Sequence, residues 1–505
     1  MFLIVFILIL LRSLLCAIYK KKRNRKRLAG TLNERFQFIF LLMIRIQSKM
    51  ENIEARDQKP LTILFLPFVC YGPINQSIAM GDILRSRGHR VVIVVNETWK
   101  EKVASLGFEI CLIDLTDSTK PGFDEYWKNF IRDVIPNLRQ SSITHLEPYV
   151  CPLMCRAIEE AKLYQKQLGS ILNQIQPNVI IQDNPAGFPI LVTNSVPFIR
   201  FVSCNPLEIP GPNVPPTFSG LPQNDRTDWD RFRAEYERLH RSIWEEFNSW
   251  AQQQGAPSLP DLEFNYESKY ANIYIYPREA DYIEHRPLGS KWYQIDSSVR
   301  LTDQAYELPA CLRNRPDGSC LIYVSLGTIG CTVVDLLQRL IDVLRRTTHR
   351  FIISTGPLED QLKLPDTMVG EGFIPQTKVL PLVDLVITHG GNNTVTEVLH
   401  FGKPMILLPM FWDQHDNAQR MHEMGFGIRL DTYNFKDEDL LTAVDTLLND
   451  SALRDRMAHL GEQIRQRDGL RTAVDIIENV AFSYDLCNRE KKYRLSTNLS
   501  SPSCH

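Results

Sequence analysis

The feature that most constrains the fold of this 505-residue chain is an alternation of short apolar runs with segments of helical periodicity, which occurs twice. The first series begins at residue 61 and the second at residue 321. Short apolar runs bounded by turn residues are typical of buried parallel strands, and periodic segments between them are typical of crossover helices. The chain is therefore predicted to form two α/β domains, which also suits its length.

The first series predicts strands at residues 61–67, 91–95, 110–113, 179–181, 198–202 and 273–276. A helix is expected at 75–87, and a longer, aromatic and charged helix at 229–254. This longer helix follows a Pro-rich loop. Such an insertion either shapes the mouth of a substrate site or simply packs on the surface, and both interpretations stay open.

The second series predicts strands at residues 321–325, 351–354, 385–388 and 405–408. Helices are expected at 333–346, twice within 435–465, and at 470–484. Residues 301–318 lack periodicity and contain Pro309, Pro316 and Gly318, so they are predicted to be an interdomain linker.

The expected organisation is thus an N-terminal extension at 1–58, a Rossmann-like domain at 59–300, the linker, and a second Rossmann-like domain at 319–505. The last helix is expected to pack back on the first of these domains. Two such domains that face one another place a ligand cleft at the carboxyl ends of their strands.

The N-terminal extension begins with an apolar run, residues 1–19, and the basic run KKKRNRKR follows it. One interpretation is a membrane anchor whose basic flank lies on the cytosolic side. The alternative is that these residues precede the true start and that Met50 is the initiator. A signal peptide fits less well, because its basic cluster would precede the apolar run.

Composition excludes some functions. A net charge of −2 with scattered basic residues gives no field that would attract nucleic acid. The 11 cysteines include no CxxC pair and no metal-ligand spacing with histidine, so no metal site is predicted. An odd, unpatterned set of cysteines suits a reducing compartment, and a cytoplasmic body is expected.

The most informative segment follows the predicted strand 385–388, which ends in His389-Gly390-Gly391. Two glycines let the backbone turn tightly and approach a ligand. A helix then opens at Asn392, and its free N–H groups and positive dipole end favour an anion. Because His389 can add a further hydrogen-bond donor, the segment predicts a diphosphate site.

Simpler interpretations exist for single residues. Thr394-x-x-Glu397 also matches a capping box, which would satisfy backbone donors and nothing else. His389 alone could be a hydrogen-bonded core histidine. The order strand, turn and helix favours the ligand site over these alternatives.

Three stretches carry a resemblance to a known family: Phe373-Ile-Pro-Gln376, His389-Gly-Gly-Asn-Asn-Thr-Val-Thr-Glu397 and Asp413-Gln414. They resemble the signature of the UDP-glycosyltransferases, family 1 with the GT-B fold, and the order of elements is similar from about residue 61 to 484. The short spacer at 379–384 is similar to that of the branch of bacterial macrolide-type and arthropod, mite-like proteins.

The resemblance implies a GT-B fold and inverting, metal-independent transfer of a hexose, with glucose as the first guess. The donor would be a UDP-sugar, the acceptor a small lipophilic molecule, and no cofactor would be needed. Phe373 would stack on uracil, although much of the family has Trp there, so nucleotide binding is expected to be weaker. Gln376 and Glu397 would bind the ribose, and Asp413 and Gln414 the sugar hydroxyls. The rest of the implied donor site is Gly327, Thr328, His389, Gly390, Gly391, Asn393 and Thr394.

On the acceptor side, the family places a catalytic His in the loop after the first strand and an Asp that orients it about a hundred residues later. Asp183 matches the Asp, although it could also be a cap or turn residue before Asn184-Pro185. Pro73 stands where the His is expected. Proline suits a helix start and has no titratable group, and loss of a general base costs about 10²–10⁴-fold in rate.

Three substitutes for the missing base are open: Asp183 with a pKa raised by burial, Tyr71 or Cys70, or an acceptor acidic enough to need little help. The alternative is a catalytically weakened protein that binds UDP-sugar or another ligand. An NAD-dependent oxidoreductase is disfavoured because neither first strand is followed by GxGxxG.

The glycosylation sequons Asn75-Gln76-Ser77 and Asn392-Asn393-Thr394 both fall in the predicted site. A glycan on either asparagine would block the cleft. This too favours a cytosolic body.

Overall fold

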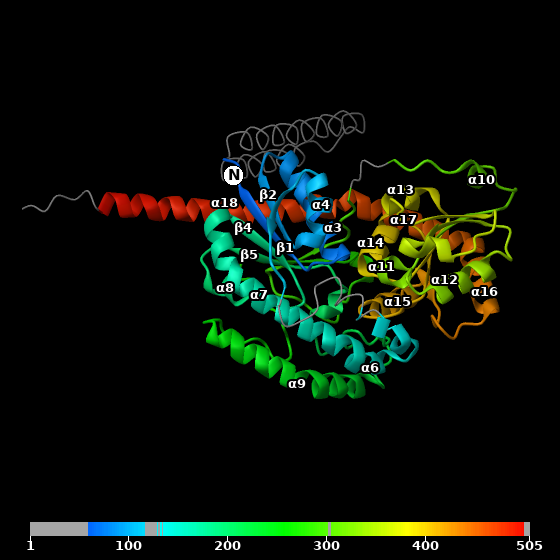
Figure 1. Ribbon diagram of the computed structural model, residues 1–505, viewed down its shortest axis with the longest axis horizontal. Helices are drawn as coiled ribbons and strands as arrows, with labels where there is room; N and C mark the ends of the chain where they lie inside the picture. Colours follow the sequence, from blue (N-terminus) through cyan, green and yellow to red (C-terminus); the bar gives the residue numbers. More distant parts are fainter. Residues whose placement is uncertain (1–58, 117–128, 130–131, 134, 301–304, 499–505) are drawn as a thin grey trace, which may run out of the picture. The chain divides into compact units, whose positions relative to one another are not determined.

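The computed structural model describes residues 59–116, 129, 132–133, 135–300 and 305–498 (Figure 1). The described residues from Leu61 onward belong to one compact unit. The predicted anchor at residues 1–19 lies outside the described residues. Within the part of the chain that is described, helices are either too short or too polar to cross a membrane.

The first sheet has seven parallel strands in the order β3-β2-β1-β4-β5-β6-β7. All six predicted strands are confirmed, with bounds shifted by at most two residues, and the edge strand β7 was not predicted. The strands are β1 (Thr62–Pro67), β2 (Arg90–Val95), β3 (Glu109–Leu112), β4 (Val179–Asp183), β5 (Phe198–Val202), β6 (Ala271–Ile275) and β7 (Trp292–Ile295).

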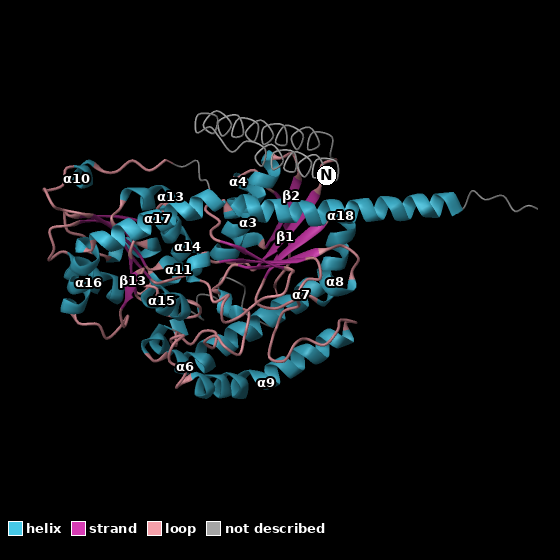
Figure 2. Cartoon of the chain, turned by 180° about the vertical axis from the view of Figure 1, so that it is seen from behind, coloured by secondary structure: helices cyan, strands magenta, loops and turns pink. Residues whose placement is uncertain are grey.

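Helices surround this sheet (Figure 2). The helix predicted at 75–87 begins earlier, at Tyr71, because the residues around Pro73 already have helical geometry. The predicted helix at 229–254 is α9, which packs against α7 and so forms an outer layer. The helices of this half are α3 (Tyr71–Ser86), α4 (Glu97–Ser105), α6 (Ser142–His145), α7 (Cys151–Ile175), α8 (Pro189–Thr193) and α9 (Trp229–Gln253).

The second sheet has six parallel strands in the order β10-β9-β8-β11-β12-β13. The four predicted strands are confirmed as β8, β9, β11 and β12, whereas β10 and β13 were not predicted. The strands are β8 (Leu321–Ser325), β9 (Arg350–Ser354), β10 (Met368–Glu371), β11 (Leu385–Thr388), β12 (Met405–Leu407) and β13 (Gly427–Arg429).

The helices of this second half include those predicted at 333–346, within 435–465 and at 470–484. A short helix, α10, falls within the predicted linker. The helices are α10 (Ala310–Arg313), α11 (Gly327–Gly330), α12 (Val334–Leu344), α13 (Gln376–Val379), α14 (Asn392–His400), α15 (Gln414–Glu423), α16 (Asp437–Asn449), α17 (Ser451–Arg467) and α18 (Gly469–Asn498).

Both sheets reverse their strand order between two central strands, β1 and β4 in the first and β8 and β11 in the second. Ligands of open α/β sheets bind at the carboxyl ends of strands at such a switch point. In the first sheet Pro67 lies opposite Asp183, and in the second Ser325 lies opposite Thr388. The fold therefore brings the loop after β1 next to Asp183, and the loop after β8 next to His389.

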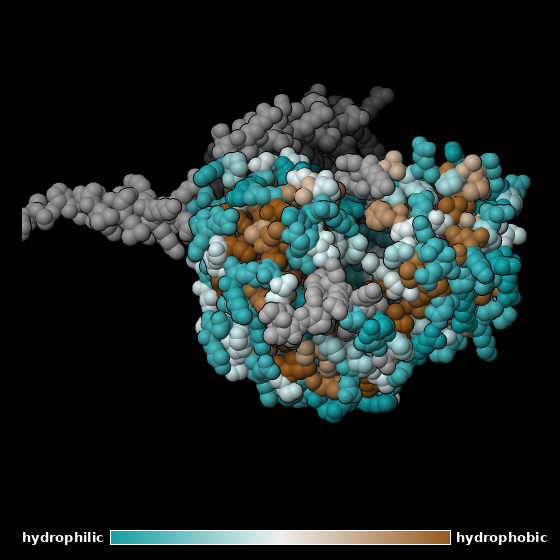
Figure 3. All heavy atoms as spheres, viewed as in Figure 1, coloured by the Kyte–Doolittle hydropathy of each residue, from teal (hydrophilic) through white to brown (hydrophobic). Residues whose placement is uncertain are grey.

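The last helix, α18, packs along α3 of the N-terminal half, residues 61–300. Arg87 Nη1 lies 2.6 Å from Asp475 Oδ1 and 2.7 Å from Glu478 Oε2, and His89 Nε2 lies 2.9 Å from Glu478 Oε1. On the face shown in Figure 3, hydrophobic residues form separate patches among mainly hydrophilic ones, as is usual for a protein surface.

Candidate functional site

The imidazole of His389 lies between two glycine turns. A Cβ atom added to Gly327 would lie 2.5 Å from His389 Nε2, and one added to Gly391 would lie 2.6 Å from it. Gly327 also has a φ of +73°, which side chains rarely adopt. Burial lowers the pKa of His389 to about 4, although a hydrogen bond with the backbone of Ser325 acts to raise it. The ring is therefore neutral at pH 7 and bears one N–H.

The helix α14 begins directly after these turns. Its N-cap is Gly391, which supplies no side-chain cap, so the capping box considered for Thr394 and Glu397 is not formed. The Glu397 carboxylate instead accepts a hydrogen bond from Gln376 Nε2 at 2.6 Å, and Thr394 Oγ1 lies 3.4 Å from the same nitrogen. The two residues predicted to bind the ribose are thus in contact.

Burial raises the pKa of Glu397 to about 7, while the Gln376 hydrogen bond and the charge of Arg300 act in the opposite direction. Phe373, which follows β10, is 57% exposed, so its ring is accessible to a stacking base. Thr328 is also exposed, at the start of α11. These groups belong to the predicted nucleotide-sugar site, which we call the donor site.

Two asparagines at the start of α14 bind the N-terminal half. Asn392 Nδ2 donates to the carbonyl oxygens of Ser203, at 2.8 Å, and Ile275, at 3.1 Å. Asn393 Nδ2 donates to the Gly72 carbonyl at 3.2 Å. The Asn393 Oδ1 atom accepts from Gln76 Nε2 at 2.9 Å. Asn393, predicted as a diphosphate ligand, therefore also joins the two halves.

Asp413 and Gln414, the predicted sugar ligands, are both buried. Asp413 Oδ2 accepts a hydrogen bond from the backbone N–H of Asn205 at 2.9 Å. Gln414 Oε1 accepts from the backbone N–H groups of Met410, at 3.0 Å, and Phe411, at 3.2 Å. In this structure these side-chain oxygens therefore bind the protein itself.

Sequence reasoning missed a set of α15 and β13 side chains that bind backbone atoms of the N-terminal half. Asp416 accepts from the N–H groups of Phe218, at 2.6 Å, and Gly220, at 2.8 Å. Their only signal in the sequence is a density of polar residues just after Asp413-Gln414. The others are Arg420, which donates to the carbonyls of Ala280 and Asp281, Glu423, which accepts from the N–H of Gln223 at 2.8 Å, and Arg429, which donates to the carbonyl of Gly220.

Asp183 ends β4 at the first switch point and is 8% exposed. It precedes no helix directly, and its Oδ2 atom has no hydrogen-bond partner among the described residues. Burial raises its pKa to about 8, helped by the charge of Glu208 and opposed by hydrogen bonds from Ser203. A buried carboxyl with an unused oxygen and a perturbed pKa is a candidate for a functional group, as the sequence predicts for Asp183.

Cys70 and Tyr71, which the sequence offers as substitutes for the missing histidine, lie just before Pro73. Pro73 is buried within the first turn of α3. Burial, with the charge of Asp183, raises the pKa of the Cys70 thiol far above its ordinary value, which disfavours Cys70 as a base at neutral pH. The exposed Tyr71 side chain packs against Trp99 instead.

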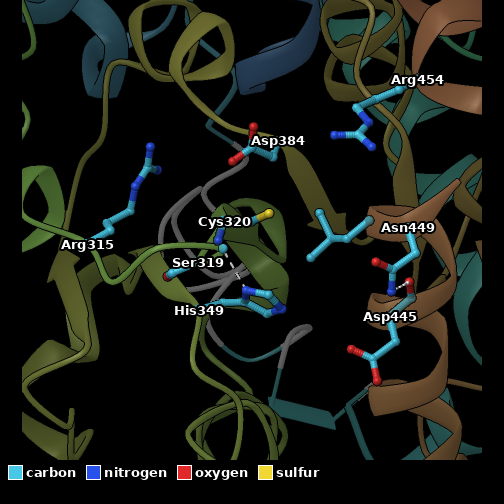
Figure 4. Close-up of a pocket in the computed structure, with 10 residues that line it drawn as sticks. Arg315, Ser319, Cys320, His349, Asp384, Asp445, Asn449 and Arg454 are labelled. Carbon is cyan, nitrogen blue, oxygen red and sulfur yellow. Dashed lines mark hydrogen bonds between the residues drawn. The ribbon is translucent and has the colours of Figure 1, made fainter. Parts of the chain in front are cut away.

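A separate cavity lies at the opposite, amino edge of the second sheet (Figure 4). Cys320 and Asp384, which precede β8 and β11, line it together with His349, whose Nδ1 accepts a hydrogen bond from the Cys320 N–H at 3.2 Å. None of the predicted site residues lines this cavity. In the described ranges, this cavity included, no three His, Cys, Asp or Glu side chains are grouped to hold a metal ion.

Comparison with known proteins agrees with this geometry. Residues 312–480 match the family described as "UDP-glucoronosyl and UDP-glucosyl transferase". The chain is 23% identical over 428 residues to NDP-glycosyltransferase YjiC of Bacillus subtilis (strain 168), with 83% of this chain and 97% of that protein covered.

It is also 21% identical over 481 residues to the sterol 3-beta-glucosyltransferase of Komagataella phaffii, covering 88% of this chain and 37% of that longer protein. Among solved structures, the glycotransferase of kitacinnamycin superposes with a TM-score of 0.63 and 19% identity, covering 84% of this chain and all of that one.

Two parallel Rossmann-like sheets, of seven and six strands, that superpose on a solved glycotransferase define the GT-B fold. Residues 312–480 carry the UDP-glycosyltransferase domain, and the chain is an enzyme of the glycosyltransferase class. The donor is accordingly a nucleotide sugar.

Proposed function

We propose that the chain transfers a hexose, most simply glucose, from a UDP-sugar to a small lipophilic acceptor. The transfer inverts the anomeric centre and needs no metal ion. The acceptor oxygen attacks C1 of the sugar, the bond from C1 to the diphosphate breaks, and UDP leaves. The bacterial macrolide-type and arthropod branch is the proposed relationship within the family.

The observation that carries this proposal is the donor site itself. The closely packed His389 ring and the first turn of α14, whose backbone has no side-chain cap, suit the negative charge that develops on the leaving diphosphate. The contact between Gln376 and Glu397 suits a ribose, since it offers an amide and a carboxylate to two neighbouring hydroxyls. A lipophilic acceptor and glucose are supported by the name of the similar sterol 3-beta-glucosyltransferase.

An alcohol acceptor must lose a proton, and Asp183 is the group proposed to take it. A carboxylate whose pKa is about 8 is a far stronger base than an ordinary one, although it is largely protonated at pH 7. Transfer to alcohols should therefore be slow at neutral pH and faster above pH 8.

The test uses the full chain with UDP-glucose and a panel of phenols, flavonoids and aliphatic alcohols, and follows UDP release and product mass. Asp183→Asn, which keeps the shape of the side chain, is expected to lower transfer to these acceptors by about 10²–10⁴-fold. If UDP raises the melting temperature but no acceptor is glycosylated, the chain is a binding protein. If UDP does not bind, the donor site is wrongly assigned.

We also infer a cytosolic body. The side-chain nitrogen of Asn392, in the second sequon, is buried and donates to two carbonyl groups, so the folded chain has no room for a glycan there. Expression through a secretory pathway tests this, because a glycosidase-sensitive mass on active protein would contradict it.

A further inference from the structure

Two cations border the turn that carries Pro73. The Lys102 ammonium lies 4.0 Å from the centre of the Tyr71 ring and 4.8 Å from that of Trp99. The two rings are themselves in edge contact at 4.7 Å. Tyr71 is 43% exposed, so this caged lysine lies at the surface of the turn and not in the core. Cation–π contacts of this kind hold an ammonium in place without neutralising it.

The second cation is Arg300. Its Nη1 atom lies 3.4 Å from Asn75 Oδ1, two residues beyond Pro73. Burial, helped by the charge of Arg300, lowers the pKa of Lys102 to about 8. Across the residues that the structure describes, no carboxylate forms an ion pair with Lys102 or Arg300. Two neighbouring cations with which no described carboxylate forms an ion pair make a favourable place for an anion.

The same turn adjoins the donor site. The carbonyl of Gly72 and the amide of Gln76, on either side of Pro73, both bind the side chain of Asn393 at the start of α14. Arg300 also acts electrostatically on Glu397. An anion held by the two cations would therefore lie beside the start of α14, which is proposed to bind the diphosphate. An acceptor must lie beside the diphosphate to attack the sugar.

Pro73 stands in place of the usual general base, and the raised pKa of Cys70 disfavours this thiol as a substitute. An alcohol or phenol acceptor suffers from this loss, because its proton must go to a base. A carboxylic acid does not, since its proton is already in solution at neutral pH.

We propose that the acceptor is a lipophilic carboxylic acid whose carboxylate binds against Lys102 and Arg300 and attacks the sugar without a general base. This inference rests on the proposed function and names the acceptor class of the same site. One carboxylate oxygen forms a bond to C1, the bond from C1 to the diphosphate breaks, and UDP leaves with the electron pair. No proton is transferred, and the product is a 1-O-acyl sugar ester.

The first test compares matched acceptors that differ only in the reacting group: decanoic acid with 1-decanol, and phenylacetic acid with 2-phenylethanol. With the full chain and UDP-glucose at pH 7, the acids are expected to have a kcat/KM about 10²-fold higher or more, because they avoid the loss of the base. Cleavage of the product by hydroxylamine identifies an ester. Transfer to the alcohols but not to the acids would overturn the inference and leave the proposed function standing.

The second test removes the cation. Lys102→Met keeps the length of the side chain over the rings, and is expected to raise the KM for decanoic acid about tenfold, the effect of one hydrogen bond to a charged group. Its KM for 1-decanol and its affinity for UDP should not change. Lys100→Met is the matched control on the same helix, because Lys100 pairs with Glu97 at 2.8 Å and not with the turn.

An equal effect of Lys102→Met on the acid and the alcohol would indicate a structural role and refute the carboxylate subsite. No transfer to any acceptor, with UDP still bound, would refute the proposed function and the inference together.

Discussion

The buried carboxyl of Glu397 should make nucleoside binding depend on pH. Burial raises its pKa to about 7 even though Gln376 donates a 2.6 Å hydrogen bond to it. A carboxylate accepts hydrogen bonds with both oxygens, whereas a protonated carboxyl must use one as a donor. If Glu397 accepts from the ribose hydroxyls, binding needs the ionised form, and affinity rises as pH rises through 7.

The size of the effect follows from this pKa. At pH 6 about one site in eleven would be ionised, so the affinity would be about tenfold weaker than at pH 8, or about 1.4 kcal/mol. Binding at pH 6 would also release about 0.9 proton, and binding at pH 8 about 0.1. Uridine is the ligand of choice, because the terminal phosphate of UDP itself titrates near pH 6.

The assay is calorimetric titration with uridine from pH 6 to 8 in two buffers that differ in ionisation enthalpy. Glu397→Gln should remove the pH dependence and the proton release. Asp413→Asn should retain both, which matters because burial raises the pKa of Asp413 to about 7 as well. An affinity that is flat from pH 6 to 8, or a pH dependence that survives in Glu397→Gln, would refute the assignment.

Three further predictions address stacking, the contact between the halves, and stability. Phe373→Trp should tighten uridine binding by about two- to fivefold, because a larger ring adds about 0.5–1 kcal/mol of stacking, and an unchanged affinity would show that this ring does not touch the base. Asn392→Leu should lower the free energy of unfolding by about 1–3 kcal/mol, since it leaves the carbonyls of Ser203 and Ile275 without donors, whereas an unchanged melting temperature would contradict the contact. The folded chain raises the pKa of Asp183 to about 8, whereas its unfolded value is near 4, so the protonated carboxyl contributes fully to the free energy of unfolding below pH 4 and this contribution is lost as pH rises to 8. Chemical denaturation should show the free energy of unfolding fall over this range, and Asp183→Asn should lessen the fall.

The strands could be predicted because buried parallel strands are continuous apolar runs. Residues 91–95, Val-Val-Ile-Val-Val, leave little alternative, and all are buried. The edge strand β7 was not predicted because three of its four residues are partly or fully exposed. The strand β13 was not predicted because it has only three residues and includes Arg429. The long helix α7 was missed although its buried residues, such as Ala157, Ala161, Tyr164 and Leu168, follow helical spacing, so the signal was present.

Within the candidate site, local order was predictable and long-range partners were not. Gln376 and Glu397 were assigned to one ribose, and the structure brings them into contact. The position of His389 next to Gly327 follows from the switch point, which the strand pattern implies. In contrast, Asn393 and Asp413 bind residues more than 200 positions away along the chain, and such contacts depend on how the halves approach one another.

The contacts between the halves have an evolutionary consequence. Side chains of the second half bind carbonyl or N–H groups of the first, among them those of Ser203, Gly220 and Ile275. A mutation changes a side chain but keeps the peptide group, so the first half can diversify in sequence without losing these partners. At these backbone contacts the N-terminal half can therefore change its side chains as long as its backbone path is kept, whereas the contacts of Gln76, Arg87 and His89 depend on the side chains themselves.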